Sequence, residues 1–240
     1  MIYSVGKVIV ILYVNYKKQE FYLNHENEIL SVATSFTSKN LCASGEMCPS
    51  PSIHIWQRDT MKTLAVLKGD HVNGVLLISF IYEDKYIISC SLKIESSIII
   101  HDWENHVIIH SFNLISTVQD IDTFSSEVNN ENILLDSLAG KNYRRLENYM
   151  LDNCAVICTN YEIVVVKFKN NSFNTFAIPA IKSDNNSEIL SVGIIKYFKE
   201  EENSELKIQT HSGILFLTGH KDGSVNLWNE KGFISIYISC

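Results

Sequence analysis

The stretch SIHIWQ (Ser52–Gln57) is followed one repeat later by SIIIHD (Ser97–Asp102), and comparing the two decides the fold. Both are short apolar runs, and Trp56 and His101 occupy matching positions 45 residues apart. Self-similarity at a fixed period is the sequence signature of repeat architectures. The chain is therefore expected to be built from units of roughly 45 residues.

Two further landmarks keep the same register. His25 and His71 each precede an apolar run and lie 46 residues apart. Ser44 and Ser89 each close the next run and lie 45 residues apart. Chance alternation would rarely place three landmarks in one register.

The unit recurs twice more with looser spacing. In residues 164–178, the alignment puts Val166 in the place of His101. The last copy, residues 217–237, has these landmarks: Thr218, a tight Asp222–Gly223 turn, and Trp228 in the slot of Trp56. Residues 5–25 resemble the last two strands of a preceding unit.

The units consist of short runs rich in Ile, Val, Tyr and Phe, separated by turn-forming Asn, Asp, Gly and Ser. This pattern predicts β-strands rather than helices. The best helix candidate is roughly residues 134–151, inside a polar insertion.

A repeat of this length, with four strands and a Trp ending the third, has the size and signature of a WD40 repeat. We predict an all-β, WD40-type β-propeller with about four blades plus a half blade. Because propellers close with roughly 4–8 blades, we expect a partial propeller. The predicted parts of this single domain are the end of a preceding blade at 1–24 and blades at 25–70, 71–117, 118–180 (insertion 128–153) and 187–240 (insertion 199–211).

The sequence LCASGEMCPSPSIHIWQRDTMKTLAVLKG, residues 41–69, resembles a blade of the echinoderm microtubule-associated protein-like family. In that family an Ala-Ser/Thr-Gly strand end precedes a loop ending in Pro, an Ile-x-Ile/Val-Trp strand and a Thr-Leu pair. The matching positions are Ala43, Ser44, Gly45, Pro51, Ile53, Ile55, Trp56, Thr60 and Leu64. Residues 214–228 are similar to the family's Leu-Thr-Gly and Trp strand pair.

This resemblance covers most of residues 18–228 apart from the insertions. It implies part of a tandem propeller that binds tubulin or microtubules. The family's hydrophobic motif upstream of its first propeller is not visible in the sequence.

His101 and Asp102 look like a catalytic pair when read alone. On a strand, neighbouring side chains point to opposite faces, so these two cannot form a dyad with each other. The repeat instead puts His101 in the structural Trp slot and Asp102 at the surviving Asp of the Trp-Asp pair.

In WD repeats generally, a leading His, a Ser or Thr of the second strand, an Asp and the Trp of the third strand form a buried hydrogen-bonded set. The residues predicted to fill such structural positions are His25, Ser44 and Trp56 in the first full repeat; His71, Ser89, His101 and Asp102 in the second; and Thr218, Asp222 and Trp228 in the last. Neither of the first two repeats shows a clear turn Asp.

Metal binding could be imagined at two sets: His101, His106 and His110, or Cys154 with Cys158. Neither has the ligand spacing of a metal motif with a second half elsewhere, so core and surface roles are favoured. We expect no catalytic residue, metal or cofactor.

Charge and composition limit the classes of partner. The formal net charge of −7 gives no reason to expect nucleic acid. The apolar run at residues 8–14 is too short to span a bilayer, and no membrane partner is expected. Six cysteines without a CxxC pair favour a reduced, cytoplasmic setting.

The favoured interpretation is a non-enzymatic WD-repeat scaffold for protein–protein interactions, associated with the cytoskeleton as the resemblance implies. The alternative is a generic WD40 adaptor in a flagellar, trafficking or ubiquitin-ligase assembly. An enzyme carried on a propeller is a further alternative, and it would need three convergent ionisable side chains in a channel pocket.

Overall fold

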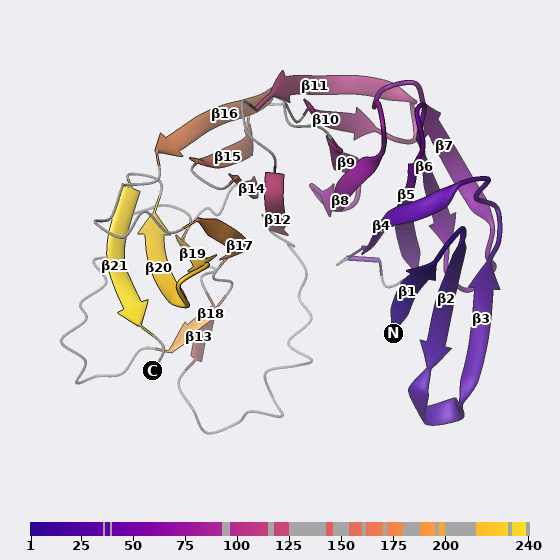
Figure 1. The fold of residues 1–240 in the computed structure, drawn as a ribbon, viewed down its shortest axis with the longest axis horizontal. Helices are drawn as coiled ribbons and strands as arrows, with labels where there is room; N and C mark the ends of the chain where they lie inside the picture. The colour runs from indigo at the N-terminus through magenta and orange to yellow at the C-terminus, as the bar shows by residue number, and fades with distance from the viewer. Residues whose placement is uncertain are drawn as a thin grey trace.

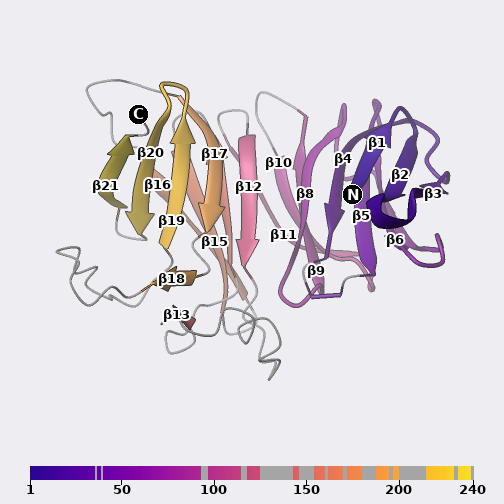
Figure 2. The ribbon, with the colours of Figure 1, turned by 90° about the horizontal axis from the view of Figure 1, so that it is seen from below.

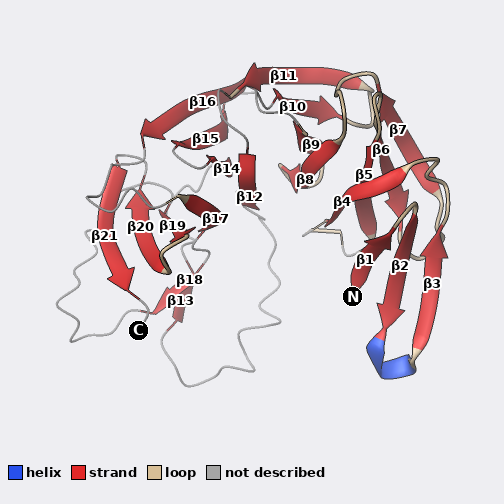
Figure 3. Cartoon of the chain, viewed as in Figure 1, coloured by secondary structure: helices blue, strands red, loops and turns tan. Residues whose placement is uncertain are grey.

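A computed structural model describes residues 1–35, 37–38, 40–92, 97–114, 118–124, 143–145, 154–159, 162–169, 172–179, 188–194, 197–199, 215–229 and 232–238. In these residues every regular element is a β-strand except the short 3-10 turn η1 (Val14–Tyr16), as Figure 3 shows. The all-β prediction is confirmed. The described part contains no helix of sufficient length and apolarity to cross a membrane.

Most of the strands form antiparallel sheets that follow one another along the chain. The first sheet comprises β1 (Ile2–Val5), β2 (Val8–Tyr13) and β3 (Lys18–Tyr22). The second comprises β4 (Glu28–Thr34), β5 (Leu41–Met47), β6 (Ser52–Gln57) and β7 (Thr63–Lys68). The third comprises β8 (Val75–Ile81), β9 (Tyr86–Ser91), β10 (Ser97–Asp102) and β11 (Val107–Asn113).

Two more four-stranded sheets and one small pair complete the described strands. The fourth sheet comprises β12 (Val118–Phe124), β14 (Cys154–Thr159), β15 (Glu162–Lys169) and β16 (Ser172–Pro179). The fifth comprises β17 (Ile189–Ile194), β19 (Leu215–His220), β20 (Ser224–Asn229) and β21 (Gly232–Ile238). The small pair is β13 (Tyr143–Arg145) with β18 (Tyr197–Lys199).

The sheets fan out in an arc (Figure 1), with β4, β8, β12 and β17 on its inner side and β7, β11, β16 and β21 on its outer side. In the perpendicular view of Figure 2 the inner strands stand side by side. Radial repetition of antiparallel four-stranded sheets is the architecture of a β-propeller. The fold is therefore propeller-like, as the repeat predicted.

Several middle strands of the second, third and fourth sheets have both faces covered. β9 and β14 are buried along their whole length, and β6 along all but its last residue. Strands buried on both faces read as continuous apolar runs, which is why YIISCS and CAVICT lack clear alternation. The outer strand β11 is mostly exposed.

The apolar core lies between neighbouring sheets rather than within one. Ile9 and Ile11 of the first sheet pack with Ile29, Cys42 and Trp56 of the second. Three similar clusters join the second sheet to the third, the third to the fourth, and the fourth to the fifth. Each sheet is therefore stabilised mainly by its neighbours.

A β-bulge marks the position of the repeated Trp. The pairing of the third and fourth strands shifts register between Ile55 and Trp56, and between Ile100 and His101. It shifts in the same way between Leu227 and Trp228. The β15–β16 pair, where the alignment puts Val166 in that slot, has no such shift.

The structure differs from two details of the sequence analysis. The first sheet has three strands, whereas the sequence suggested the last two strands of a unit. Its extra strand, IYSV, is short and not strongly apolar. Within the helix candidate at 134–151, Tyr143–Arg145 forms strand β13, and the rest of that segment lies outside the described residues.

Gly45 lies at the contact between the second and third sheets. A Cβ atom placed there would stand 2.6 Å from Val75 Cβ, 2.9 Å from Ile78 Cδ1 and 2.9 Å from Ser31 Oγ. Two of these neighbours belong to β8 of the next sheet. Only a glycine permits this close approach of β5 to β8.

Gly45→Ala is expected to destabilise the protein by about 1–3 kcal/mol, because overpacking forces the two sheets apart. Urea unfolding would measure this loss. Gly193→Ala is the matched control, since Gly193 also lies in a strand and has nothing within 4 Å of its hypothetical Cβ. Equal stability of both variants would contradict the role given to Gly45.

Candidate functional site

The second sheet contains a continuous chain of buried hydrogen bonds that begins at Trp56. Its indole Nε1 donates to Ser44 Oγ over 3.1 Å, and Ser44 Oγ is 2.7 Å from His25 Nε2. His25 Nδ1 lies 3.0 Å from Glu46 Oε1. Because an ionised carboxylate can only accept, His25 donates from Nδ1 and accepts the Ser44 hydroxyl proton at Nε2.

Glu46 supplies the acidic group of this buried hydrogen-bonded set, for which the sequence showed no clear turn Asp. It ends the buried part of β5, and its other oxygen accepts from Ser52 Oγ at 2.7 Å and from Ser52 N at 3.2 Å. Asn27 Nδ2 also donates to this oxygen, Oε2, and the Glu26 backbone N–H donates to Oε1. Burial opposes ionisation, but hydrogen bonds from Ser52, His25 and Asn27 outweigh it and lower the pKa of Glu46 to about 2.

A second chain runs from Glu46 through His54 to the first sheet. Ser52 Oγ donates to Glu46, so it accepts from His54 Nε2 at 3.1 Å. His54 Nδ1 then accepts from Tyr22 OH at 2.9 Å, and the same hydroxyl lies 2.8 Å from Thr63 Oγ1. The His25 and His54 rings stack with centroids 3.9 Å apart. Desolvation and the neighbouring His25 lower the pKa of His54 to about 4.

His25, Glu46 and His54 also have the composition of a metal site, with ligand atoms within 4.8 Å of one another. Each of those atoms already has a hydrogen-bond partner inside the protein. A metal ion would have to displace these buried partners. The arrangement is best explained as a fully satisfied polar network.

The third sheet has a thinner version of the first chain. His71 Nε2 is 2.8 Å from Ser89 Oγ, which repeats the His25–Ser44 contact. Ser91 stands where Glu46 stands in the second sheet, and it accepts the backbone N–H of Ser97. His71 Nδ1 consequently has no hydrogen-bond partner among the residues that the structure describes. Burial and the neighbouring His101 lower the pKa of His71 to about 4.

His101 and Asp102 make separate contacts and form no dyad. His101 Nε2 is 2.9 Å from Asp70 Oδ2, while its Nδ1 has no hydrogen-bond partner in the described part of the chain. The carboxylate of Asp102 accepts from the backbone N–H and the side-chain amide of Asn105, at 3.1 and 3.0 Å. Asp102 therefore holds the turn between β10 and β11.

The fifth sheet keeps the Trp contact in another form. Trp228 Nε1 donates to Thr218 Oγ1 over 2.7 Å, and Thr218 Oγ1 is 2.9 Å from His220 Nε2. Asp222 accepts from the Ser224 backbone N–H at 2.9 Å and from its hydroxyl at 2.7 Å. Asp222 thus closes the β19–β20 turn, which Gly223 completes with a φ of +85°.

The structure places the residues of the two metal-binding sets considered from the sequence as follows. His101 is buried at its slot, His106 is exposed, and His110 stacks near Phe112 and Phe173. Cys154 and Cys158 lie in the apolar cluster between the fourth and fifth sheets.

Sequence reasoning missed Glu46 and His54, and also Ser52 and Tyr22, which link them into the network. Alternation along a strand places Glu46 on the same face as Ser44, two residues earlier. That spacing was the one available signal for Glu46.

No protein-family model matches this sequence. A solved structure described as "Structure of U3-55K", a WD40 β-propeller protein, is similar, with a TM-score of 0.65 and 15% sequence identity. The match covers 99% of this chain and 60% of that chain, so this chain spans about 60% of the length of that protein. The similarity establishes a WD40-like β-propeller fold.

Ser44→Ala is expected to cost more stability than Ser89→Ala. Removing Ser44 leaves two buried groups without a partner, the Trp56 indole N–H and His25 Nε2. Removing Ser89 leaves His71 Nε2 without its partner and otherwise breaks only a long 3.4 Å bond to the backbone O of Ile99. Each stranded group costs about 1–3 kcal/mol. Urea unfolding of both variants measures the difference, and a larger loss for Ser89→Ala would contradict the network described for the second sheet.

Stability is expected to fall as the pH drops below about 6.5. The pKa of His54 and of His71 is about 4 in the folded protein, so the unfolded chain binds more protons between these pH values. The stabilising effect is present above about pH 6.5 and is lost toward about pH 4, with a slope of at most about 1.4 kcal/mol per pH unit for each histidine.

Urea unfolding across this range should show a shallower slope for His71→Gln than for the wild-type protein. His106→Gln changes an exposed histidine and serves as the control. Parallel slopes for wild type and His71→Gln would exclude the buried histidine as a source of the pH dependence.

Proposed function

We propose that this protein is a non-enzymatic WD-repeat scaffold that binds other proteins. The observation that carries the proposal is that the clustered ionisable residues of the second sheet are already hydrogen-bonded to other groups of the protein. Glu46, His25 and His54 are buried, and their polar atoms are consumed by contacts within and between sheets. Such groups stabilise a framework whose exposed loops and faces remain available to partners.

The enzyme alternative is weaker for the same reason. The ionisable side chains of His25, Glu46 and His54 do converge, but they are buried. Their hydrogen bonds are made to other groups of the protein without a substrate. A general acid or base needs access to the proton that it transfers. The low pKa of Glu46 also makes this carboxylate a poor proton donor near neutral pH.

The partner that we propose is tubulin or the microtubule, in the cytoplasm. Support comes from the resemblance of residues 41–69 and 214–228 to the echinoderm microtubule-associated protein-like family. Microtubule surfaces are acidic and this chain is also acidic, with a net charge of −7. Binding therefore requires a local surface whose charge differs from that of the whole molecule.

Co-sedimentation with microtubules and direct binding to tubulin heterodimers test the proposed partner. We expect binding in at least one of the two assays, weakening as salt is added. The Gly193→Ala variant provides a folded reference for the binding measurements. A blank in both assays would remove the cytoskeletal assignment and favour a generic WD40 adaptor.

A further inference from the structure

Positive charge is concentrated at the beginning of this acidic chain. The first 19 residues contain three lysines, Lys7, Lys17 and Lys18, and no acidic residue. The remaining 221 residues therefore hold 17 basic and 27 acidic side chains of the 20 and 27 in the whole chain. Two of the three lysines are adjacent: Lys17 ends the turn after β2, and Lys18 begins β3.

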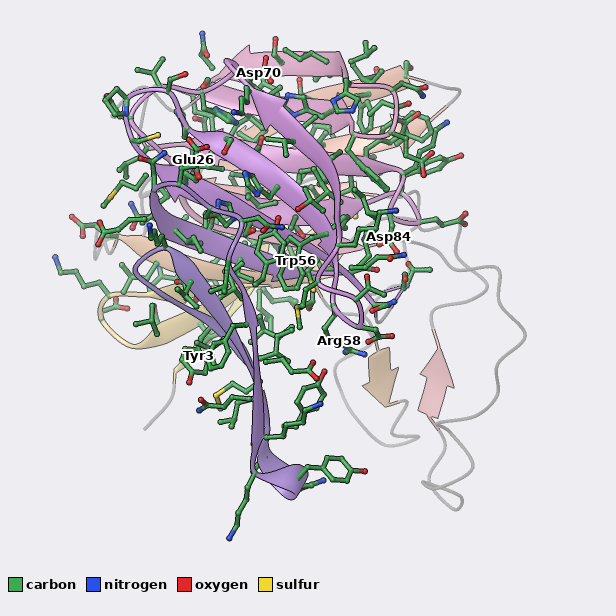
Figure 4. All side chains as sticks on the ribbon, turned by 90° about the vertical axis from the view of Figure 1, so that its right-hand side faces the viewer. Tyr3, Glu26, Trp56, Arg58, Asp70 and Asp84 are labelled. Carbon is green, nitrogen blue, oxygen red and sulfur yellow. The ribbon has the colours of Figure 1, made fainter. Side chains whose placement is uncertain are left out.

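That turn projects from the body of the molecule. Figures 1 and 4 show the β2–β3 hairpin reaching beyond the neighbouring sheets, with η1 at its end. We call residues 14–18 the basic tip. Tyr16 is 80% exposed and Val14 is 63% exposed. An aromatic and an aliphatic side chain thus stand in solvent beside two lysines.

The hairpin holds the basic tip in a defined position. Tyr13 pairs with Lys18 across the two strands, and Lys17 adopts a left-handed conformation with φ of 50° that closes the turn. Lys18 Nζ is 2.5 Å from Glu20 Oε1, and the same carboxylate accepts from Tyr13 OH at 3.0 Å. Among the described residues, Lys17 has no ion-pair partner, so its charge remains available.

We propose that the basic tip binds a flexible acidic segment of a protein partner. Lys17 would attract the carboxylates of the bound segment, and Tyr16 and Val14 would pack against the CH₂ groups of its side chains. Aromatic residues are enriched where protein surfaces bind partners, and charge complementarity raises the rate of encounter. This inference rests on the proposed function, because it assumes that the partner is a protein.

A flexible segment suits the tip better than a flat anionic membrane. The rest of the molecule carries the excess of acidic residues, which a planar anionic surface would also face and repel. A narrow acidic segment can instead contact the tip while staying about a Debye length, roughly 8 Å at physiological salt, from the body. The hairpin projects in the direction that such a separation requires (Figures 1 and 4).

The test uses a fluorescein-labelled decaglutamate peptide and the full chain, with binding followed by fluorescence anisotropy. We expect Lys17→Glu to weaken binding about tenfold or more, the equivalent of about 1.4 kcal/mol. Tyr16→Ala is expected to weaken binding without any change in charge. Neither side chain is buried, so both variants are expected to fold, and urea unfolding checks this.

Lys62→Glu is the matched control. Lys62 is exposed in the loop between β6 and β7, the same strand connection in the next sheet, and its substitution changes the net charge equally. We expect it to leave peptide binding nearly unchanged. Equal weakening by Lys62→Glu and Lys17→Glu would overturn the proposal, because it would indicate diffuse attraction without a site.

Two other outcomes would also overturn it. One is no binding of the peptide by the wild-type chain; the other is binding to phosphatidylserine vesicles in place of the peptide. Tubulin binding separates this inference from the proposed function. If tubulin binding persists in Lys17→Glu and Tyr16→Ala, only the role of the basic tip is rejected. If the peptide binds and tubulin does not, only tubulin as the partner is rejected.

Discussion

Burial between neighbouring sheets is the constraint on which the structure depends. No single four-stranded sheet can cover both of its own faces, so each buries its apolar residues against the next. The cluster that includes Ile9, Ile29 and Trp56 joins the first two sheets, and similar clusters join the others. Gly45 shows how close this packing is, since one added carbon would collide with the next sheet.

Close packing of sheets makes buried polar groups costly unless they are paired. The second sheet meets this condition with the chain from Trp56 through Ser44 and His25 to Glu46. A branch through His54 reaches Tyr22 of the first sheet, so the same network ties two sheets together. The polar network therefore orients loops and strands, and the apolar clusters supply most of the stabilisation.

The repeats differ in how they satisfy this condition. Where Ser91 replaces Glu46 and His101 replaces Trp56, His71 Nδ1 and His101 Nδ1 have no hydrogen-bond partner among the described residues. Variation of this kind is tolerable because the apolar clusters between neighbouring sheets supply most of the stabilisation. The exposed basic tip is one place on the described surface where charge and apolar side chains combine.

The sequence by itself determined the fold class and the repeat. Short Ile- and Val-rich runs at a period of about 45 residues were enough for an all-β propeller, because side-chain pattern alone specifies strands. Trp56 and His101, aligned in the sequence, both lie at a bulge on the third strand of a sheet.

Tertiary structure decided the partners of those residues. Glu46 meets His25 across 21 residues, and Tyr22 meets His54 across 32. Such contacts depend on strand register and on which sheet is the neighbour, and neither is encoded in local spacing. The sequence thus determined which strands form, while the packing of sheets decided which polar groups meet.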